Sequence, residues 1–244
     1  KQQGKAVKDT LSSNFKDNDI FFEKVKLTEE YIRNGLKRIV FIACGSAYHA
    51  GMVGKNVVES LCGINSSAEI ASEFRYSKAL VDSSTLAVFI SQSGETADTL
   101  AALRVAKEKG AKTLSIVNVK ESAIAKEAQS VIYTLAGREV SVATTKAYSC
   151  QLMMLSLIAM YLGIKKGKLG EGILEEYDNL GKLIEEVLVD TKSLEKIAKK
   201  IYKKKDVFFL GRKIDYSLCM EASLKLKEIS YIHSEAYAAG ELKH

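Results

Sequence analysis

The chain has 244 residues, of which 47% are hydrophobic and 27% charged, and these proportions exclude an intrinsically disordered protein. The net charge of +6 indicates a lysine-rich surface, with anionic substrates as the weaker alternative. Four cysteines without a C-x-x-C pair, and only three histidines, argue against zinc and favour buried free thiols in a reducing compartment. We therefore expect a cytoplasmic protein.

Strands and helices are predicted to alternate along most of the chain. Apolar residues at helical spacing predict N-terminal helices over 6–11 and 20–36. Apolar runs predict strands at 37–43, 85–90, 113–118 and 131–135, and helices follow them at about 46–61, 95–109, 122–128 and 146–162. No structure is assigned to 69–76. This alternation predicts an α/β fold with a doubly wound, mainly parallel sheet, in which ligands bind beyond the carboxyl ends of the strands.

The longest apolar stretch, residues 152–164, is too short to cross a bilayer and predicts a buried helix. The N-terminus has no apolar signal-peptide region. We expect no membrane partner. The basic run at 199–205 contains a single aromatic residue and precedes a predicted strand, so we expect a solvated helix end and no nucleic-acid partner.

The last third of the chain resembles the beginning of the first. Helices are predicted at about 173–189 and 192–204, and a buried strand at 206–211 ends in a glycine, as does the run at 39–45. A helix and a Glu-containing segment follow in both places, so we expect a second copy of the same unit. That copy stops before its later strands, and half a sheet cannot bury its faces alone. We expect the chain to be a piece of a longer one, divided into a first domain over 1–165, a connector over 166–190 and a partial second domain over 191–244.

The segment SQSGET (91–96) stands where a predicted strand becomes a helix, and it contains no Lys or Arg. The unpaired N–H groups and the dipole of a helix N-terminus attract anions. Ser91, Gln92, Ser93 and Thr96 add hydrogen-bond donors, and Gly94 permits close approach of the backbone. A phosphate monoester fits this chemistry, as does an ordinary N-cap formed by Ser93, and the number of donors slightly favours phosphate.

A second candidate site lies near the C-terminus. Glu221, Lys225 and Glu228 have the i, i+4, i+7 spacing of one helix face. A surface ladder of ion pairs is the default interpretation of such spacing. The functional alternative makes Glu228 a proton shuttle whose acidity is tuned by Lys225. His244, at the end of the chain, is a candidate acid or base only by its rarity.

Four motifs together resemble the isomerase half of the glutamine–fructose-6-phosphate aminotransferases, the glucosamine-6-phosphate synthases. They are CGSAYHAG (44–51), SQSGETADTLAALRVAKEKG (91–110), EVSVATTKAY (139–148) and EASLKLKEISYIHSEAYAAGELKH (221–244). The resemblance covers essentially the whole chain. It implies two sugar isomerase (SIS) domains, each built on a five-stranded parallel sheet, with the sugar phosphate bound in the first.

The resemblance also implies roles for individual residues. Ser91, Gln92, Ser93 and Thr96 match the phosphate-binding residues, and Ser46, Val142 and Thr144 match the lining of the sugar site. Glu228 matches the residue that moves a proton between C1 and C2, Lys225 a lysine near the reacting end, and His244 the ring-opening histidine supplied by the neighbouring subunit of a homodimer. Ala47 stands where the family commonly has a hydroxyl.

The implied reaction converts fructose-6-phosphate and ammonia into glucosamine-6-phosphate, without a metal or organic cofactor. The ammonia comes from an N-terminal glutaminase domain, which these 244 residues do not contain, and we expect little turnover from them alone. Two alternatives stay open. One is a non-catalytic SIS module that senses sugar phosphates, and the other is a deaminating relative that shares the phosphate site.

Overall fold

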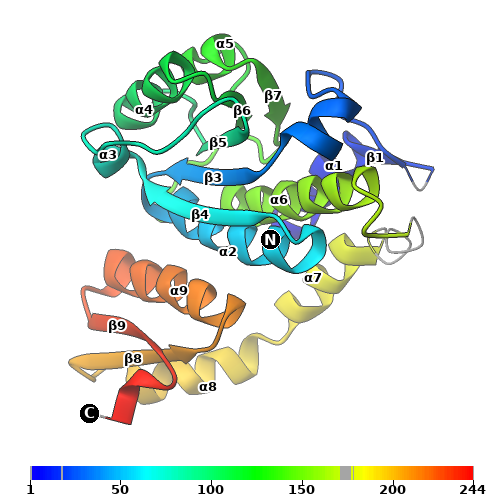
Figure 1. Ribbon diagram of the computed structural model, residues 1–244. Coiled ribbons are helices and arrows are strands. Elements are labelled where there is room, and N and C mark those ends of the chain that lie inside the picture. Colours follow the sequence, from blue (N-terminus) through cyan, green and yellow to red (C-terminus); the bar gives the residue numbers. More distant parts are fainter. Residues whose placement is uncertain (1, 18, 171–176, 178, 244) are drawn as a thin grey trace.

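A five-stranded parallel sheet organises the first two thirds of the molecule (Figure 1). The computed structural model describes residues 2–17, 19–170, 177 and 179–243. The strand order is β4-β3-β5-β6-β7, and every neighbouring pair is parallel. The strands are β3 Arg38–Ala43, β4 Asn65–Ile70, β5 Thr85–Ser91, β6 Lys112–Val117 and β7 Ser130–Tyr133. This arrangement confirms the predicted doubly wound sheet.

Helices cover both faces of the sheet, which explains why its central strands are apolar throughout. Successive residues of a strand point to opposite faces. Accordingly Ile39 and Phe41 of β3 belong to one buried cluster, and Val40 and Ile42 to another. In Figure 1, helices pack directly on the lower and on the upper face of the sheet. The lower helices are α2 Gly45–Cys62 and α6 Lys146–Lys165, and the upper ones are α3 Ala71–Phe74, α4 Ala97–Glu108 and α5 Ala123–Glu127.

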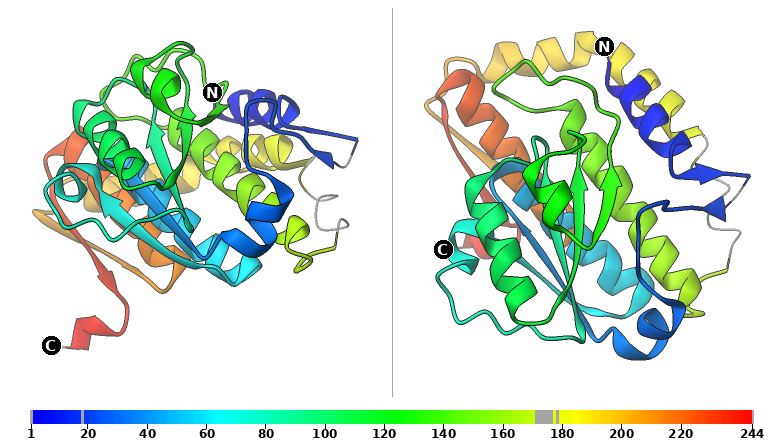
Figure 2. Two further views of the ribbon diagram at one scale, coloured as in Figure 1. Left: turned by 45° about the horizontal axis from the view of Figure 1, so that its top comes forward. Right: turned by 90° about the horizontal axis from the view of Figure 1, so that it is seen from above.

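The long apolar helix α6 is a core element. By length and composition it could cross a membrane, since an 18-residue window has a mean hydropathy of 1.5, but 67% of that window is buried inside the protein. It packs against α2 on one side and against α1 (Gln3–Ser12) on another, as the views of Figure 2 also show. The prediction of a buried helix at 152–164 is therefore confirmed.

The N-terminal segment departs from the prediction. Helix α1 is present, but the helix expected over 20–36 is wrong. The chain instead forms a small antiparallel pair, β1 (Phe15–Lys16) with β2 (Asp19–Ile20). It becomes helical only from Glu29, in a turn that is π-helical over Tyr31–Gly35. Phe15 and Ile20 pair directly and are buried in the core cluster beside α6. The apolar residues thus anchor an extended segment on the core, and their helical spacing does not reflect a helix.

Strand β4 was not predicted, because its sequence NSSAEI contains no apolar run. It lies at the edge of the sheet and pairs only with β3. An edge strand has one free side and needs fewer apolar residues than a central one. Its formation depends on the register set by β3, from Arg38 with Asn65 to Ala43 with Ile70.

The last third contains a second β-α-β unit, which confirms the expected internal repeat. Strands β8 (Asp206–Gly211) and β9 (His233–Ala238) form a two-stranded parallel sheet, joined by α9 (Ile214–Ser230). Helices α7 (Leu180–Val189) and α8 (Thr191–Ile201) lead into it, and a 3-10 turn, Glu241–Lys243, follows. Part of the helix predicted at 173–189 lies outside the described residues. The described α7 begins at Leu180.

The prediction that β8 is a buried strand is wrong. Its residues alternate between exposed and half-buried, and Phe208 keeps 54% of its surface exposed. The strand is apolar in sequence, as predicted. In the described part of the chain, however, the β8–β9 sheet has only two strands, with one helix, α9, between them. The faces of β8 are therefore covered far less completely than those of β3.

Candidate functional site

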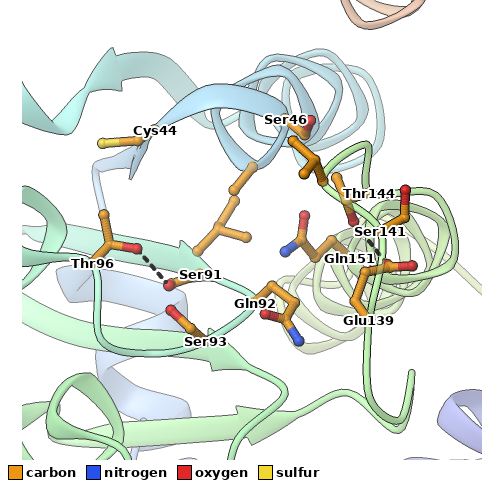
Figure 3. Close-up of a pocket in the computed structure, with 13 residues that line it drawn as sticks. Cys44, Ser46, Ser91, Gln92, Ser93, Thr96, Glu139, Ser141, Thr144 and Gln151 are labelled. Carbon is orange, nitrogen blue, oxygen red and sulfur yellow. Dashed lines mark hydrogen bonds between the residues drawn. The ribbon is translucent and has the colours of Figure 1, made fainter. Parts of the chain in front are cut away.

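A cavity of about 280 Å³ opens at the carboxyl edge of the five-stranded sheet (Figure 3). The chain proceeds from β3 to β4 in one direction and from β5 to β7 in the other, so the winding reverses between β3 and β5. Doubly wound sheets bind ligands at this switch point. The volume is close to the lower end, about 300 Å³, of small-molecule pockets. The lining residues are Cys44, Ser46, Ala47, Ile90, Ser91, Gln92, Ser93, Thr96, Glu139, Ser141, Val142, Thr144 and Gln151.

The hydroxyl groups of the 91–96 segment do not cap the helix that follows. Helix α4 begins at Ala97, with Thr96 at the N-cap position, and the Thr96 side chain makes no capping hydrogen bond. Its Oγ1 lies 3.1 Å from Ser91 Oγ instead. Ser93 Oγ accepts from the N–H of Glu95, outside the helix, at 3.2 Å. The interpretation of Ser93 as an ordinary N-cap is therefore wrong.

The first turn of α4 keeps its hydrogen-bond donors free. Within the described residues, no acceptor is assigned to the backbone N–H groups of residues 97–99, whereas Leu100 N–H already donates to the carbonyl of Thr96 at 2.9 Å. These N–H groups and the helix dipole provide partial positive charge at the cavity, where no Lys or Arg is among the lining residues. The arrangement can hold a small anion without a cationic side chain.

In the loop before α4, Gly94 packs tightly against a neighbouring segment. Gly94 has a left-handed φ of 67°, and a Cβ placed on it would lie 2.0 Å from Ser122 Oγ. Its carbonyl accepts from Ile124 N–H at 3.0 Å, and its own N–H donates to Ser91 Oγ at 3.0 Å. Only glycine fits here without displacing Ser122, and the two hydrogen bonds fasten the loop to Ser91 and to the start of α5.

The opposite wall of the cavity is the loop that leads into α6. Glu139 Oε2 accepts from Thr144 Oγ1 at 2.9 Å and from the N–H of Ala147 at 3.1 Å, which secures the loop to the start of the helix. The Val142 side chain is 94% exposed at the rim. The Glu139 carboxylate adds negative charge to this side, so the anion-binding end is the α4 side.

The structure brings seven of the sequence-predicted residues into this one cavity. They are Ser46, Ser91, Gln92, Ser93, Thr96, Val142 and Thr144. Ala47, the position at which the resemblance leads us to expect a hydroxyl, lines it as well. Glu228 and Lys225 are not among the lining residues, and His244 lies outside the described residues.

Glu228 and Lys225 belong to a chain of ionisable groups along α9. Lys225 Nζ lies 2.5 Å from Glu228 Oε2 and 3.6 Å from Glu221 Oε1, and Glu221 Oε2 lies 2.8 Å from Nδ1 of His49 in α2. The expected ion-pair ladder is present, but it is not a surface feature, since the Glu221 side chain is only 7% and that of Lys225 19% exposed. Of the two interpretations, the structure contradicts the simple surface ladder.

Helix α9 runs antiparallel to α2, and this direction relates the ladder to the cavity. His49 contacts Glu221, whereas Asn56, two turns later in α2, contacts Ser217, one turn earlier in α9. Residues beyond Glu221 therefore lie toward the N-terminal end of α2, which is the end that lines the cavity. Lys225 and Glu228 are on the cavity side of the α2–α9 contact.

A tyrosine from α6 completes the surroundings of Glu221. Burial, and secondarily the charge of Glu221, raise the pKa of Tyr148. The Tyr148 hydroxyl and Glu221 Oε1 are both buried, and neither has a hydrogen-bond partner among the described residues. Three helices, α2, α6 and α9, thus converge on one carboxylate.

Sequence reasoning missed four of the residues in this region: His49, Glu139, Ser141 and Gln151. A signal existed for Gln151, since it is an amide within the most apolar helix of the chain. None existed for His49, because its partner Glu221 is 172 positions away. Among the described residues, no group of three or more His, Cys, Asp and Glu side chains is placed to hold a metal ion.

Comparisons with known proteins agree with this geometry. The family model described as "SIS domain" matches residues 34–161 and 200–244. Glutamine–fructose-6-phosphate aminotransferase [isomerizing] from Clostridium tetani is 48% identical over 248 aligned positions, covering 100% of this chain and 41% of that protein. The protein of the same name from Methanosarcina acetivorans is 41% identical, with 100% and 40% covered. The chain thus spans about two fifths of the length of these curated relatives.

Solved structures show the same relationship. The C-terminal domain of glucosamine-fructose-6-phosphate aminotransferase from Francisella tularensis matches with a TM-score of 0.94 and 38% identity, covering 100% of this chain and 70% of that one. Glucosamine-6-phosphate deaminase from Thermotoga maritima matches with a TM-score of 0.71 and 22% identity, covering 100% and 69%. At that identity the second likeness concerns the fold alone.

Proposed function

Since this chain belongs to the SIS domain family, within the branch formed by the isomerase domains of the glutamine–fructose-6-phosphate aminotransferases, we propose that its cavity binds fructose-6-phosphate. The observation that carries this proposal is the start of α4, where the hydroxyl groups at 91–96 leave the helix N–H groups free. Such donors can bind the phosphate group of an ester without the help of a cationic side chain.

The reaction proposed for the whole protein combines fructose-6-phosphate with ammonia to give glucosamine-6-phosphate and water. The curated relatives are more than twice the length of this chain, and the proposed ammonia source is a glutaminase domain N-terminal to it. Ser91, Gln92, Ser93 and Thr96 hold the phosphate, and Ser46, Val142 and Thr144 contact the sugar. We place the protein in the cytoplasm.

Glu228 is proposed to carry the proton between C1 and C2 as a general base and then a general acid. Its neighbour Lys225, whose Nζ lies 2.5 Å from Glu228 Oε2, orients the carboxyl group. The antiparallel contact of α9 with α2 supports this assignment, because it directs both residues toward the cavity. Ring opening is assigned to His244 of the neighbouring subunit in a homodimer.

A second candidate function is a non-catalytic sugar-phosphate sensor. It is favoured by one observation: Glu228 and Lys225 are not among the residues that line the cavity. Binding alone would need nothing from α9. Turnover separates the two functions, since a sensor would bind fructose-6-phosphate and convert none of it.

The binding proposal is tested by calorimetry with the full-length protein and fructose-6-phosphate. Replacing Ser93 and Thr96 together by Ala removes two hydroxyl groups from the cavity, and we expect the affinity to fall by at least tenfold. Ser12→Ala, on the exposed side of α1, serves as the control and leaves affinity unchanged. Unchanged affinity in the double variant would refute the phosphate assignment.

A further inference from the structure

Gln151 combines three properties that no role described so far explains. It lies in α6, whose buried residues are otherwise almost entirely apolar. Only 3% of its surface is exposed, and it lines the cavity. Within the described part of the chain, no hydrogen bond reaches its carboxamide, although a carboxamide can form four. The carboxamide atoms are not among the fully buried unpartnered atoms of the described residues, so the little surface that Gln151 keeps is open to the cavity. A polar group placed in this way is normally met by a ligand or water.

Several of the neighbouring polar groups are already paired with one another. Thr144 donates to Glu139, and Ser91 pairs with Thr96. These bonds hold the two walls of the cavity and leave the Gln151 amide between them without a partner. Figure 3 shows this amide pointing into the cavity, between Gln92 on the phosphate side and Thr144 on the other.

The chemistry of the group indicates what it meets. A carboxamide is neutral and presents both a donor and an acceptor, as does a sugar hydroxyl. A phosphate, by contrast, is served by the free N–H groups of α4 on the facing wall. We propose that Gln151 binds a hydroxyl group of the sugar and is a specificity residue of this cavity, an inference that rests on the function proposed above.

Such a residue discriminates by leaving a buried polar group unpaired when the wrong ligand binds. Ligands that carry the phosphate but lack the sugar hydroxyl would occupy the α4 side and gain nothing from Gln151. Sugar phosphates would gain from both walls. The two contributions are therefore separable by the choice of ligand.

The test is a calorimetric comparison on the full-length protein with two ligands, fructose-6-phosphate and inorganic phosphate. Gln151→Met keeps the length of the side chain and removes the amide. We expect its affinity for fructose-6-phosphate to fall about tenfold, or about 1.4 kcal/mol, while that for inorganic phosphate changes less than twofold. The matched control is Met154→Leu. Met154 is fully buried in the same helix and does not line the cavity, so this variant leaves both affinities unchanged.

Each other outcome overturns the proposal in a distinguishable way. Equal weakening of both ligands would mean that Gln151 maintains the shape of the site, and no weakening of either would mean that it touches nothing. A wild-type protein that binds inorganic phosphate but not fructose-6-phosphate would overturn the proposed function itself. If Gln151→Met unfolds, Gln151→Asn replaces it, because it keeps the amide but withdraws it by one methylene, and the same selective loss is required.

Discussion

The two β-α-β units of this chain, β3-α2-β4 and β8-α9-β9, share a backbone plan and differ in burial. In both, six residue pairs form a parallel ladder, and the partner lies 27 positions along the chain (38 to 65 and 206 to 233). In both units, a residue with a positive φ stands at the start of the helix and another at its end. These are Gly45 and Gly63 in the first unit, and Lys213 and Tyr231 in the second.

The burial of the two units shows what surrounds them. All residues of β3 after Arg38 are buried, whereas β8 alternates between exposed and half-buried positions up to Gly211. Strand β3 has a neighbour on each side and helices on both faces, whereas among the described residues β8 pairs only with β9. Local spacing therefore sets the path of a β-α-β unit, and the neighbouring elements set how much of it is buried.

The largest expected difference between the units concerns their central strands. Phe41 is 1% exposed, and its ring fills the space that Gly51 and Gly54 leave on α2. Phe41→Ala should lower the free energy of unfolding by about 3–5 kcal/mol. Phe208→Ala in β8, where the side chain is half exposed, should cost about 1 kcal/mol at most. Urea unfolding followed by circular dichroism measures both.

Similar losses for Phe41→Ala and Phe208→Ala would contradict this account. They would show that the β8 face is covered in solution by something outside the described contacts. Phe41→Leu serves as a control for the first variant, because it keeps most of the buried volume and should cost clearly less than the alanine.

A smaller effect is expected where the two units meet. His49 Nδ1 is the one assigned hydrogen-bond partner of Glu221 Oε2 within the described residues. His49→Leu leaves this buried oxygen without its partner and should lower the free energy of unfolding by about 1–3 kcal/mol. His49→Asn should restore much of the loss, since its Nδ2, like the histidine Nδ1, is bonded to Cγ. If leucine and asparagine behave alike, the contact is one of packing and not of hydrogen bonding.

The smallest expected effects have opposite signs in the two units. Tyr231 ends α9 with a φ of 57°, and it is 93% exposed. Tyr231→Gly removes the strain of this left-handed conformation without losing packing. It should therefore raise the free energy of unfolding by about 0.5–1 kcal/mol. Gly63 ends α2 with a φ of 63°, and Gly63→Ala should destabilise by about 1 kcal/mol. Thermal unfolding detects both, and two shifts of the same sign would break the correspondence of the two helix ends.

The sequence predicted the parts of the fold whose signal is local. The apolar runs of β3 and β5, the helix starts after them and the repeat at β8 were all readable, because each depends on consecutive residues. The same holds for the 91–96 segment, in which the hydroxyl groups, the glycine and the start of the helix follow one another directly in the sequence. The N-terminal hairpin and β4 were not readable, because their conformation depends on partners far along the chain.

The candidate site divides in the same way. The sequence by itself predicted the residues of 91–96 that line the cavity, and glycine at position 94 permits the close contact with Ser122. Only the tertiary structure decided that Ser93 does not cap α4, that Glu221 is buried against His49, and that Gln151 points into the cavity without a partner. The physical reason is that a hydrogen bond depends on distance in space. Sequence patterns state what a side chain can bind, and the packing of helices on the sheet settles which partners it meets.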